Sequence, residues 1–232
     1  MGKGGANRPV AESMKIILTG ATGFVGSEIL SQLLQRPDVE AITCLTRRPL
    51  TVQSPKLSTI LHADFTVYPD DLAHTLADHN ALLWALGGKA SDEADPVAYE
   101  RITCTTAISC AVAIAERLTH PFRFGYLSGM GADPTETASF PWQKLTRHLK
   151  GRTEHALQVL TQQHPHFRAT AFRPGGILPR TTSSFFDKLL SPIAIRVDHL
   201  AHAMIEESTR NIAESWAVLD NSTLRKIADP SH

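Results

Sequence analysis

A glycine-rich segment near the start of the chain has residue types and a spacing that could bind a phosphate group. It follows a short β-branched run at 15–19 and leads into a helical pattern. In such a turn the first glycine permits a tight bend, the second lets backbone approach a pyrophosphate, and the third lets helix and strand pack closely. Free amides of the helix's first turn would face the anion. A dinucleotide site is predicted, with a plain glycine turn as the alternative, over Gly20, Ala21, Thr22, Gly23, Phe24, Val25 and Gly26.

A basic pair stands where the second predicted strand ends. Dinucleotide sites usually place an acid at this point, where it binds the adenosine ribose. Here the residues are Thr46, Arg47 and Arg48. Because an Arg there accommodates a 2′-phosphate, these residues favour NADP(H) over NAD(H). The alternative is that the two Arg side chains only solvate the loop before Pro49.

Short apolar runs alternate with helical patterns along most of the chain. Strands are predicted at 15–19, 41–46, 58–62, 81–86, 122–128 and 167–172. Helices are predicted at 24–34, 69–79, 96–118 and 141–163, and shorter ones at 198–207 and 221–228, with an apolar run at 216–219 between them. Asp95 before Pro96 is a typical start of the third helix. This alternation predicts an α/β fold, a doubly wound parallel sheet with helices on both faces.

A single domain with three parts accounts for this order of elements. Its length of 232 residues is enough for one sizeable core. We expect a flexible leader at 1–13, an NADP(H)-binding core at 14–180, and a small substrate-side segment at 181–232 that packs on the same domain.

The composition limits the partners and the location that we expect. The 23 Lys and Arg residues balance 23 Asp and Glu residues, so no net charge attracts the chain to nucleic acid. Three cysteines without a C-x-x-C pair argue against a disulfide framework and a zinc site, and they fit a reducing compartment. No run approaches the ~20 apolar residues of a membrane span, and no signal peptide is evident. We therefore expect a cytoplasmic protein without a membrane or nucleic-acid partner.

Seven short segments together carry a family resemblance. They are GATGFVG (20–26), LTRRP (45–49), HADF (62–65), WALGG (84–88), LSGMGAD (127–133), KGRTEHAL (150–157) and FRPGGIL (172–178). With these segments the chain resembles the atypical branch of the short-chain dehydrogenase/reductase family, which binds NAD(P) on a Rossmann fold. Within it the chain is most similar to the Tat-interacting-protein group of oxidoreductases. The resemblance implies further cofactor contacts: Asp64 and Phe65 at the adenine, Ala85, Leu86 and Gly87 at the ribose, and Pro174, Gly175 and Ile177 at the nicotinamide.

The catalytic positions depart from the family's pattern. Members usually use a Ser, a Tyr and a Lys, with Tyr and Lys in Y-x-x-x-K spacing; the Tyr hydroxyl is the acid or base, and the Lys ammonium lowers its pKa and holds the ribose. By the resemblance Lys150 is that Lys, but Thr146 stands four residues before it. The family's Ser-Ser pair here reads Ser128-Gly129. The candidate catalytic set is therefore Lys150, Thr146 and Ser128, without the Tyr.

Three functions fit this altered set, and we rank them in order. The first is an oxidoreductase for a small, largely uncharged organic carbonyl or alcohol, with a water, Thr146, Tyr126 or His148 relaying the proton. The second is a non-redox isomerase or cyclase on the same scaffold, and the third is a catalytically silent NADP(H)-binding regulator. We expect a monomer or a homodimer and no metal site, and Phe185 and Phe186 could cap the pocket.

Overall fold

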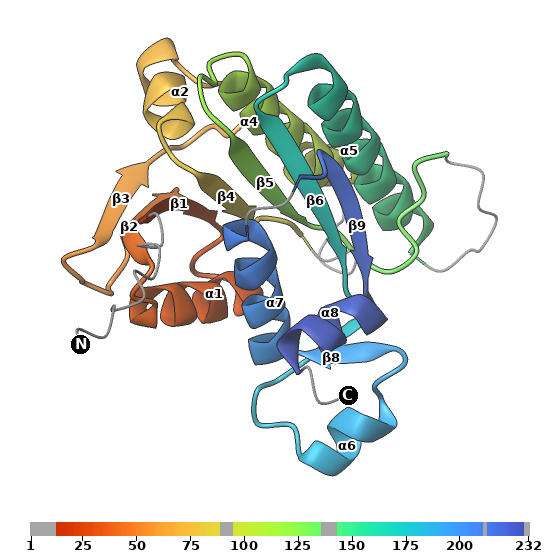
Figure 1. Cartoon of the computed structure of the whole chain (residues 1–232). Coiled ribbons are helices and arrows are strands. Elements are labelled where there is room, and N and C mark those ends of the chain that lie inside the picture. The colour runs from red at the N-terminus through yellow and green to blue at the C-terminus, as the bar shows by residue number, and fades with distance from the viewer. Residues whose placement is uncertain (1–12, 89–94, 136–142, 211–212, 230–232) are drawn as a thin grey trace, which may run out of the picture.

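The fold is built on a central, twisted sheet of seven strands (Figure 1). The computed structural model describes residues 13–88, 95–135, 143–210 and 213–229. The strands of the sheet are β1 (Met14–Thr19), β2 (Val39–Thr46), β3 (Leu57–Leu61), β4 (Ala81–Trp84), β5 (Phe122–Leu127), β6 (Phe167–Arg173) and β9 (Trp216–Asp220). Their order is β3-β2-β1-β4-β5-β6-β9, and all neighbours in it pair in parallel. The predicted α/β fold with a doubly wound parallel sheet is confirmed.

Helices cover both faces of the sheet (Figure 1). They are α1 (Phe24–Gln35), α2 (Asp70–Ala77), α3 (Pro96–Glu100), η2 (Arg101–Thr105), α4 (Thr106–Ala115), α5 (Lys144–Gln163), α6 (Ser184–Leu189), α7 (Val197–Thr209) and α8 (Asn221–Ala228). Helices α1 and α7 pack on one face with Ile16 and Leu18 of β1, and α2, α4 and α5 pack on the other face with Ile17. Successive side chains of a strand point to opposite faces, so β1 reads as a continuous apolar run because both of its faces are covered.

The order of the strands creates a point where the winding of the chain reverses. Strand β1 lies between β2 and β4, so the chain leaves β1 toward one side of the sheet and later continues on the other side. Thr19 is paired with Trp84 at the carboxyl ends of β1 and β4. In open α/β sheets, ligands bind in the crevice outside such a reversal. The glycine-rich segment, which begins at Gly20, therefore starts where this fold binds ligands.

The long helix predicted at 96–118 is a helical run from Pro96 to Ala115 with a π-helical turn, η2, inside it. The Asp95 carboxylate accepts a hydrogen bond from the Val97 amide at 2.9 Å, as the sequence predicted for the start of this helix. Length and composition alone would let Pro96–Ala115 cross a membrane, contrary to the expectation that no segment has this character. Half of this apolar stretch is buried, and α4 packs on the sheet in the core. A core helix has the same properties.

The chain after residue 180 contributes more to the central layers than a small elaboration would. The apolar run near Trp216 forms β9, which pairs with β6 at the edge of the sheet, and α7 packs against α1. A second, two-stranded sheet of β7 (Gly176–Leu178) and β8 (Ala194–Arg196) lies with α6 at the bottom of Figure 1. The predicted core at 14–180 therefore lacks one strand of the sheet, because β9 lies in the segment after 180.

Some predicted elements reach beyond the described residues. Apart from Ser13, the predicted leader lies outside them, as do residues 141–142 of the predicted helix 141–163. In the structure this helix begins at Lys144, and the preceding Gln143 has a left-handed backbone with φ 51°. The other predicted helices and strands agree with the structure to within a few residues.

Candidate cofactor and active site

The glycine-rich segment forms a tight loop between β1 and α1. Gly20 has a φ of +71°, and a Cβ added to it would lie 2.4 Å from the carbonyl oxygen of Ala85. A Cβ at Gly26 would lie 2.0 Å from the Gly20 carbonyl oxygen, so the first turn of α1 packs directly on the loop. Gly23 is the N-cap residue and provides no side-chain cap, so the first-turn amides of α1 stay open to a ligand. These features fit a pyrophosphate at the amino terminus of α1.

A cleft of about 640 Å³ lies beside this loop, within the size range of ligand sites. Its walls come from four places in the sequence: the end of β2, the segments after β3 and after β4, and the start of the helical run at Asp95 and Pro96. The lining residues are Arg47, Ala63, Asp64, Phe65, Leu86, Asp95, Val97, Ala98, Arg101, Ile102 and Thr106. The structure thus brings together Arg47, Asp64, Phe65 and Leu86, which the sequence had assigned to one cofactor. The Phe65 ring itself is buried and packs edge-on against Trp84.

Asp64 already has strong partners on the cleft wall. Its carboxylate accepts hydrogen bonds from Arg101 at 2.9 Å and from the Thr66 hydroxyl at 2.6 Å and amide at 3.0 Å. The bonds from Thr66, with Arg101 second, lower the pKa of Asp64 to about 2. Asp64 is therefore ionised at neutral pH, and its bond to Arg101 holds the helical run against the loop after β3. Sequence reasoning missed Arg101, because its pairing with Asp64 depends on tertiary packing.

The basic pair after β2 is available to a ligand. Arg47 and Arg48 are both exposed, and in the described part of the chain neither makes an ion pair. The Thr46 hydroxyl donates to the Arg48 carbonyl at 3.1 Å, which closes the turn that presents the two side chains. Thr46 thus shapes the loop, while Arg47 lines the cleft and leaves a guanidinium free for a phosphate.

The segment assigned to the nicotinamide lies after β6 and is held by the start of α8. The Gly175 amide donates to the Asn221 side-chain oxygen at 3.0 Å, and a Cβ at Gly175 would lie 2.0 Å from the Ile193 carbonyl oxygen. The Pro174 carbonyl accepts from the Met130 amide at 2.8 Å, which ties this segment to the loop after β5. Ile177 lies on β7. Asn221 is a second residue that sequence reasoning missed.

Lys150 lies at the centre of a network of polar groups beyond β5. Its Nζ donates to the Ser128 carbonyl oxygen at 2.6 Å. Burial lowers the pKa of Lys150 to about 8, and the negative charge of Glu154 one turn later opposes this shift. Lys150 is thus a cation that can release its proton near neutral pH.

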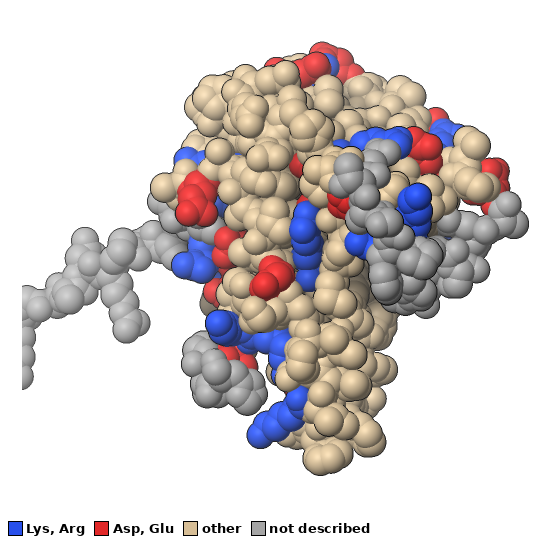
Figure 2. All heavy atoms as spheres, turned by 90° about the vertical axis from the view of Figure 1, so that its right-hand side faces the viewer, with Lys and Arg blue, Asp and Glu red and all other residues tan. Residues whose placement is uncertain are grey.

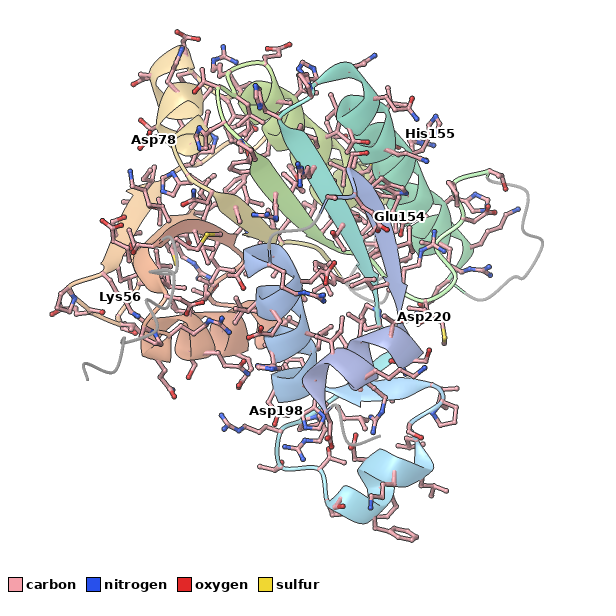
Figure 3. The ribbon with its side chains drawn as sticks, in the orientation of Figure 1. Lys56, Asp78, Glu154, His155, Asp198 and Asp220 are labelled. Atoms are coloured by element: carbon pink, nitrogen blue, oxygen red, sulfur yellow. The ribbon has the colours of Figure 1, made fainter. Side chains whose placement is uncertain are left out.

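Glu154 and Arg173 anchor this network. Glu154 is 2% exposed and pairs with Arg173, whose Nε donates to Glu154 Oε1 at 2.9 Å. Figure 3 labels Glu154 on the side of α5 that faces the sheet, and its neighbour His155 on the outer side. Both Glu154 and Arg173 lie inside segments that carry the family resemblance, which is the signal that could have identified them.

Ser128 is not placed to polarise a substrate. Its hydroxyl donates its one proton to Glu154 Oε1 at 2.5 Å, and the residue is buried. A side chain at the next residue, Gly129, would point at the Lys150 ammonium, because a Cβ there would be 3.2 Å from Lys150 Nζ. The catalytic role predicted for the Ser128 hydroxyl therefore does not fit its position, whereas the Ser128 carbonyl positions Lys150.

Of the hydroxyl groups predicted to be catalytic, Thr146 is the one that Glu154 does not engage. It lies one helical turn before Lys150 on α5, and its Oγ1 is hydrogen-bonded to the Tyr99 hydroxyl at 2.8 Å. The other two candidate relays point elsewhere. Tyr126 is buried and donates to the Thr103 carbonyl at 3.2 Å, and His148 Nε2 lies 3.9 Å from an Asp133 carboxylate oxygen.

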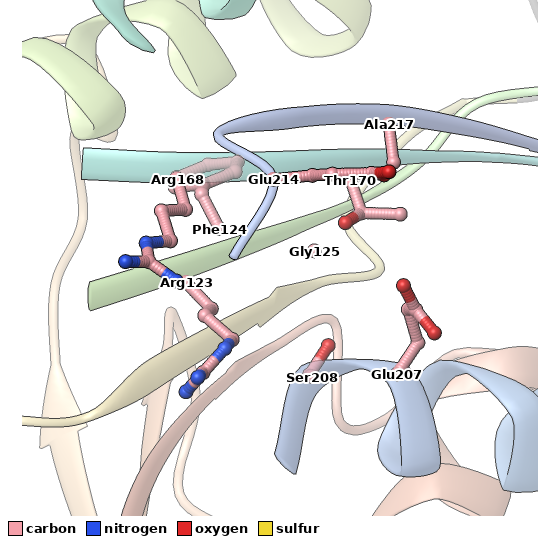
Figure 4. Close-up of a pocket in the computed structure, with 9 residues that line it drawn as sticks. All are labelled: Arg123, Phe124, Gly125, Arg168, Thr170, Glu207, Ser208, Glu214 and Ala217. Carbon is pink, nitrogen blue, oxygen red and sulfur yellow. The ribbon is translucent and has the colours of Figure 1, made fainter. Parts of the chain in front are cut away.

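A second pocket lies at the amino-terminal ends of the strands, opposite the glycine-rich loop, and is too small for a dinucleotide. Figure 4 shows it between α7 and the amino-terminal parts of β5, β6 and β9. Its volume of about 10 Å³ is room for about one water molecule. Arg123 and Arg168 lie on one side and Glu207 on another (Figure 4); burial lowers the pKa of Arg123 and raises that of Glu207. Among the described residues no group of His, Cys, Asp or Glu could hold a metal ion.

The small unit at the bottom of the molecule exposes apolar side chains. Phe185 is 71% exposed, and Phe186, Leu189 and Ile193 are also exposed. In Figure 2 the lowest part of the surface is mostly uncharged. The two Phe rings contact each other edge-on, and neither lines the cleft beside Asp64, so their role as a cap over a substrate stays a prediction.

Comparisons with known proteins agree with this geometry. A family model described as NAD(P)H-binding matches residues 20–206. The chain is 27% identical over 206 residues to leucinostatins biosynthesis cluster protein T of Purpureocillium lilacinum, covering 88% of this chain and 69% of that protein. It is 43% identical over 61 residues to the PKS-NRPS hybrid synthetase psoA of Aspergillus fumigatus, which is 23% of this chain. That match spans only 2% of the synthetase.

Solved structures show the same fold at low identity. The reductase domain of PhqB from Penicillium fellutanum is 18% identical with a TM-score of 0.63, covering 89% of this chain and 66% of that chain. WbmF of Bordetella bronchiseptica in complex with NAD+ is 16% identical with a TM-score of 0.67, covering 94% of this chain and 78% of that chain. The matched residues 20–206 contain the glycine-rich loop, the cleft and Lys150. This chain therefore belongs to the NAD(P)H-binding family, with the Rossmann fold that the sequence predicted.

Proposed function

We propose that the protein is an NADP(H)-dependent oxidoreductase that interconverts a small, largely uncharged organic carbonyl and the corresponding alcohol. The observation that carries this proposal is the position of Lys150. Its Nζ is held by the Ser128 carbonyl at 2.6 Å, beside the Thr146 hydroxyl, at the edge of the sheet where the glycine-rich loop opens. A proton donor beside a dinucleotide site is what carbonyl reduction requires.

The residues present fit the cofactor. Gly20, Gly23 and Gly26 with the open amides of α1 would hold the pyrophosphate, and the cleft beside Asp64 would hold the adenosine. Arg47 and Arg48 would bind the 2′-phosphate, which is the basis for NADP(H) rather than NAD(H). When bound, NADPH supplies a hydride to the carbonyl carbon.

The chain's own residues complete the reaction. The Thr146 hydroxyl donates a hydrogen bond to the carbonyl oxygen and orients it. As negative charge develops on this oxygen, an N–H bond of the Lys150 ammonium breaks and an O–H bond forms, and the neutral amine regains a proton from water. A pKa of about 8 lets Lys150 act as this acid at neutral pH.

The names of related proteins support reductase chemistry. Besides the PhqB reductase domain, the aldehyde reductase lnbA of Aspergillus flavus is 35% identical over 69 residues. The chain spans 7% of lnbA, and the match covers 30% of this chain. The likeness therefore favours an aldehyde or ketone as substrate.

A screen of wild-type protein tests the proposed function. NADPH consumption is measured with a panel of aldehydes, ketones and enones, and alcohols are tested with NADP+ in the reverse direction. We expect turnover of at least one carbonyl, with transfer of deuterium from labelled NADPH to the product carbon. Tight NADPH binding without turnover of any compound in the panel would contradict the proposal.

The basic pair gives a prediction about cofactor choice. Changing Arg47 and Arg48 together to Ser should raise the Kd of NADPH about 100-fold, because charge-assisted hydrogen bonds contribute about 1.5–3 kcal/mol each. The Kd of NADH should change less than about 3-fold, because it has no 2′-phosphate for an Arg to bind. Fluorescence titration with both nucleotides measures the two constants. Lys188→Ser, which removes an exposed cation on α6, is the control and should leave both unchanged. Equal losses for the two nucleotides would overturn the assignment.

A second candidate function rests on the departures from the family's catalytic set. Position 146 is Thr, and the Ser128 proton is engaged by Glu154, which also suits an isomerase or cyclase that uses the pocket without hydride transfer. Substrate turnover without any nicotinamide would favour this candidate. A silent regulator would instead bind NADPH tightly and co-purify with a partner.

The proposal extends to the setting of the protein. Cys44, Cys104 and Cys110 are all free and buried, which fits a reducing compartment, and we propose the cytoplasm. We also propose a monomer or homodimer whose partner is the small substrate, with no nucleic acid and no membrane.

A further inference from the structure

A buried tyrosine from another helix lies beside the position where the family's catalytic Tyr is missing. Tyr99 of α3 is 2% exposed, and its phenol oxygen is 2.8 Å from Thr146 Oγ1. The ring packs in a small cluster with Cys104 and Leu149. The phenol therefore cannot contact a substrate directly, but it contacts the hydroxyl that can.

Two ion pairs hold α3 and the turn after it, one to α5 and one to the cleft wall. Next to Tyr99, Glu100 accepts a hydrogen bond from Arg152 of α5 at 2.6 Å. On the other side, Arg101 pairs with Asp64 on the cleft wall. Directly after Glu100 the helix takes the π-helical turn η2, a feature frequently found at functional sites. Within this run Val97 and Ala98 line the cofactor cleft, while Tyr99 and Glu100 contact α5.

We propose that Tyr99 is a positioning residue for carbonyl reduction, which donates its phenol hydrogen bond to Thr146 and so turns the Thr146 hydroxyl proton toward the substrate oxygen. A hydroxyl has one proton and can accept a second hydrogen bond on its lone pairs. When Tyr99 donates to Thr146, the Thr146 proton has to point elsewhere, and hydrogen bonds in such a chain strengthen one another. The phenol thus acts through a threonine instead of directly. This inference rests on the proposed function, with Lys150 as the proton donor.

Variants that remove only the hydroxyl groups test this role. Tyr99→Phe keeps the ring and its packing, and we expect kcat for the best carbonyl substrate to fall about 20-fold while the Kd of NADPH stays within about 2-fold. Thr146→Ala should cause a similar loss, and Thr146→Ser should retain most of the activity. Because the two hydroxyl groups act as one unit, the double variant Tyr99→Phe/Thr146→Ala should be no slower than Thr146→Ala alone.

The matched control is Tyr126→Phe. It removes another buried phenol hydroxyl, one that bonds the Thr103 carbonyl rather than Thr146. Its kcat should stay within about 2-fold of wild type even if its melting temperature falls as much as that of Tyr99→Phe. A solvent deuterium isotope effect on kcat should be present in wild type and should change in Tyr99→Phe but not in Tyr126→Phe.

The outcomes separate this inference from the function on which it rests. If wild type turns over a carbonyl and Tyr99→Phe is as fast, or if the losses in the double variant multiply, the role of Tyr99 is refuted and the proposed function stands. If wild type turns over no carbonyl, the proposed function and this inference are both overturned.

Discussion

Replacing Lys150 with Met is expected to lower kcat for carbonyl reduction at pH 7 about 1000-fold, within the range that a general acid contributes. Met fills a similar volume without a charge or a proton, so packing on α5 should be retained. The Met variant removes the hydrogen bond to the Ser128 carbonyl and the attraction between the ammonium and Glu154, while the Glu154–Arg173 pair stays in place. The measurement is the steady-state rate with the best carbonyl of the screen, alongside the Kd of NADPH, which should rise less than about 10-fold.

The same residue determines the expected pH dependence of the wild-type enzyme. The acid must be protonated, so kcat for reduction should be level below the pKa of Lys150, about 8, and should fall as pH rises through it. Alcohol oxidation needs the neutral amine, so kcat for oxidation should instead rise as pH increases through the pKa of Lys150. Lys144→Met, which removes an exposed Lys at the start of α5, is the control and should keep both rate and profile. A Lys150→Met variant with wild-type kcat, or a reduction rate that rises above pH 8, would exclude Lys150 as the acid.

The cofactor half of the site could be predicted from sequence because it uses backbone and local spacing. Three glycines at fixed spacing after an apolar run predict the loop, and the structure shows the close approaches that a side chain at Gly20 or Gly26 would prevent. Asp64 and Leu86 came from the resemblance and do line the same cleft. These positions follow immediately after strands, so once the strand order is known, their place at the carboxyl edge of the sheet follows.

The catalytic half could not be predicted to the same extent, because it depends on which side chains meet across elements. The direction of the Ser128 hydroxyl is decided by Glu154, and Glu154 is held there by Arg173 of β6. The contact between Tyr99 and Thr146 joins residues on two helices that the sequence places far apart. The π-helical turn that follows Tyr99 has no signature in composition or periodicity. The edge strand β9 was missed for a similar reason: a run of four apolar residues does not show whether it pairs.

The two positions that depart from the family's catalytic set both lie close to groups that we assign to the proposed reaction. The family's second serine would stand at position 129, where a side chain would come within 3.2 Å of Lys150 Nζ, and the residue here is Gly. The family's Tyr would stand at 146, where the Tyr99 phenol already lies 2.8 Å from the Thr oxygen. The absence of a side chain at 129 leaves space next to the Lys150 ammonium, which supports the proposal that Lys150 is the acid.

The second large effect is expected at Glu154. Glu154→Gln keeps the shape and an acceptor for the Ser128 hydroxyl but removes the negative charge, which leaves the Arg173 guanidinium without its anion. Removing one partner of a buried ion pair destabilises a protein by about 3–5 kcal/mol, and because Arg173 is partly exposed we expect the lower figure, about 3 kcal/mol. For a chain of this size, 1 kcal/mol corresponds to roughly 2–4 °C, so the melting temperature should fall on the order of 6–12 °C. Chemical denaturation and thermal melting measure the two quantities.

The same substitution should also alter the chemistry of Lys150. The charge of Glu154 raises the pKa of Lys150 against the effect of burial, so without this charge the pKa should fall below about 8. The alkaline limb of the reduction profile should then move to lower pH, while a variant that is only less stable would keep the limb in place. Asp78→Asn is the matched control, since it breaks the exposed ion pair with Lys15 and should cost less than about 1 kcal/mol and leave the profile unchanged. If Glu154→Gln melted like wild type, the pair with Arg173 would not stabilise the protein as expected. If the fall in kcat moved to higher pH, Glu154 would not be the group that raises the pKa of Lys150. We expect both a loss of stability and a fall in kcat that begins at lower pH. Together they would show that the Glu154 carboxylate stabilises the contact between α5 and β6 and also raises the pKa of Lys150.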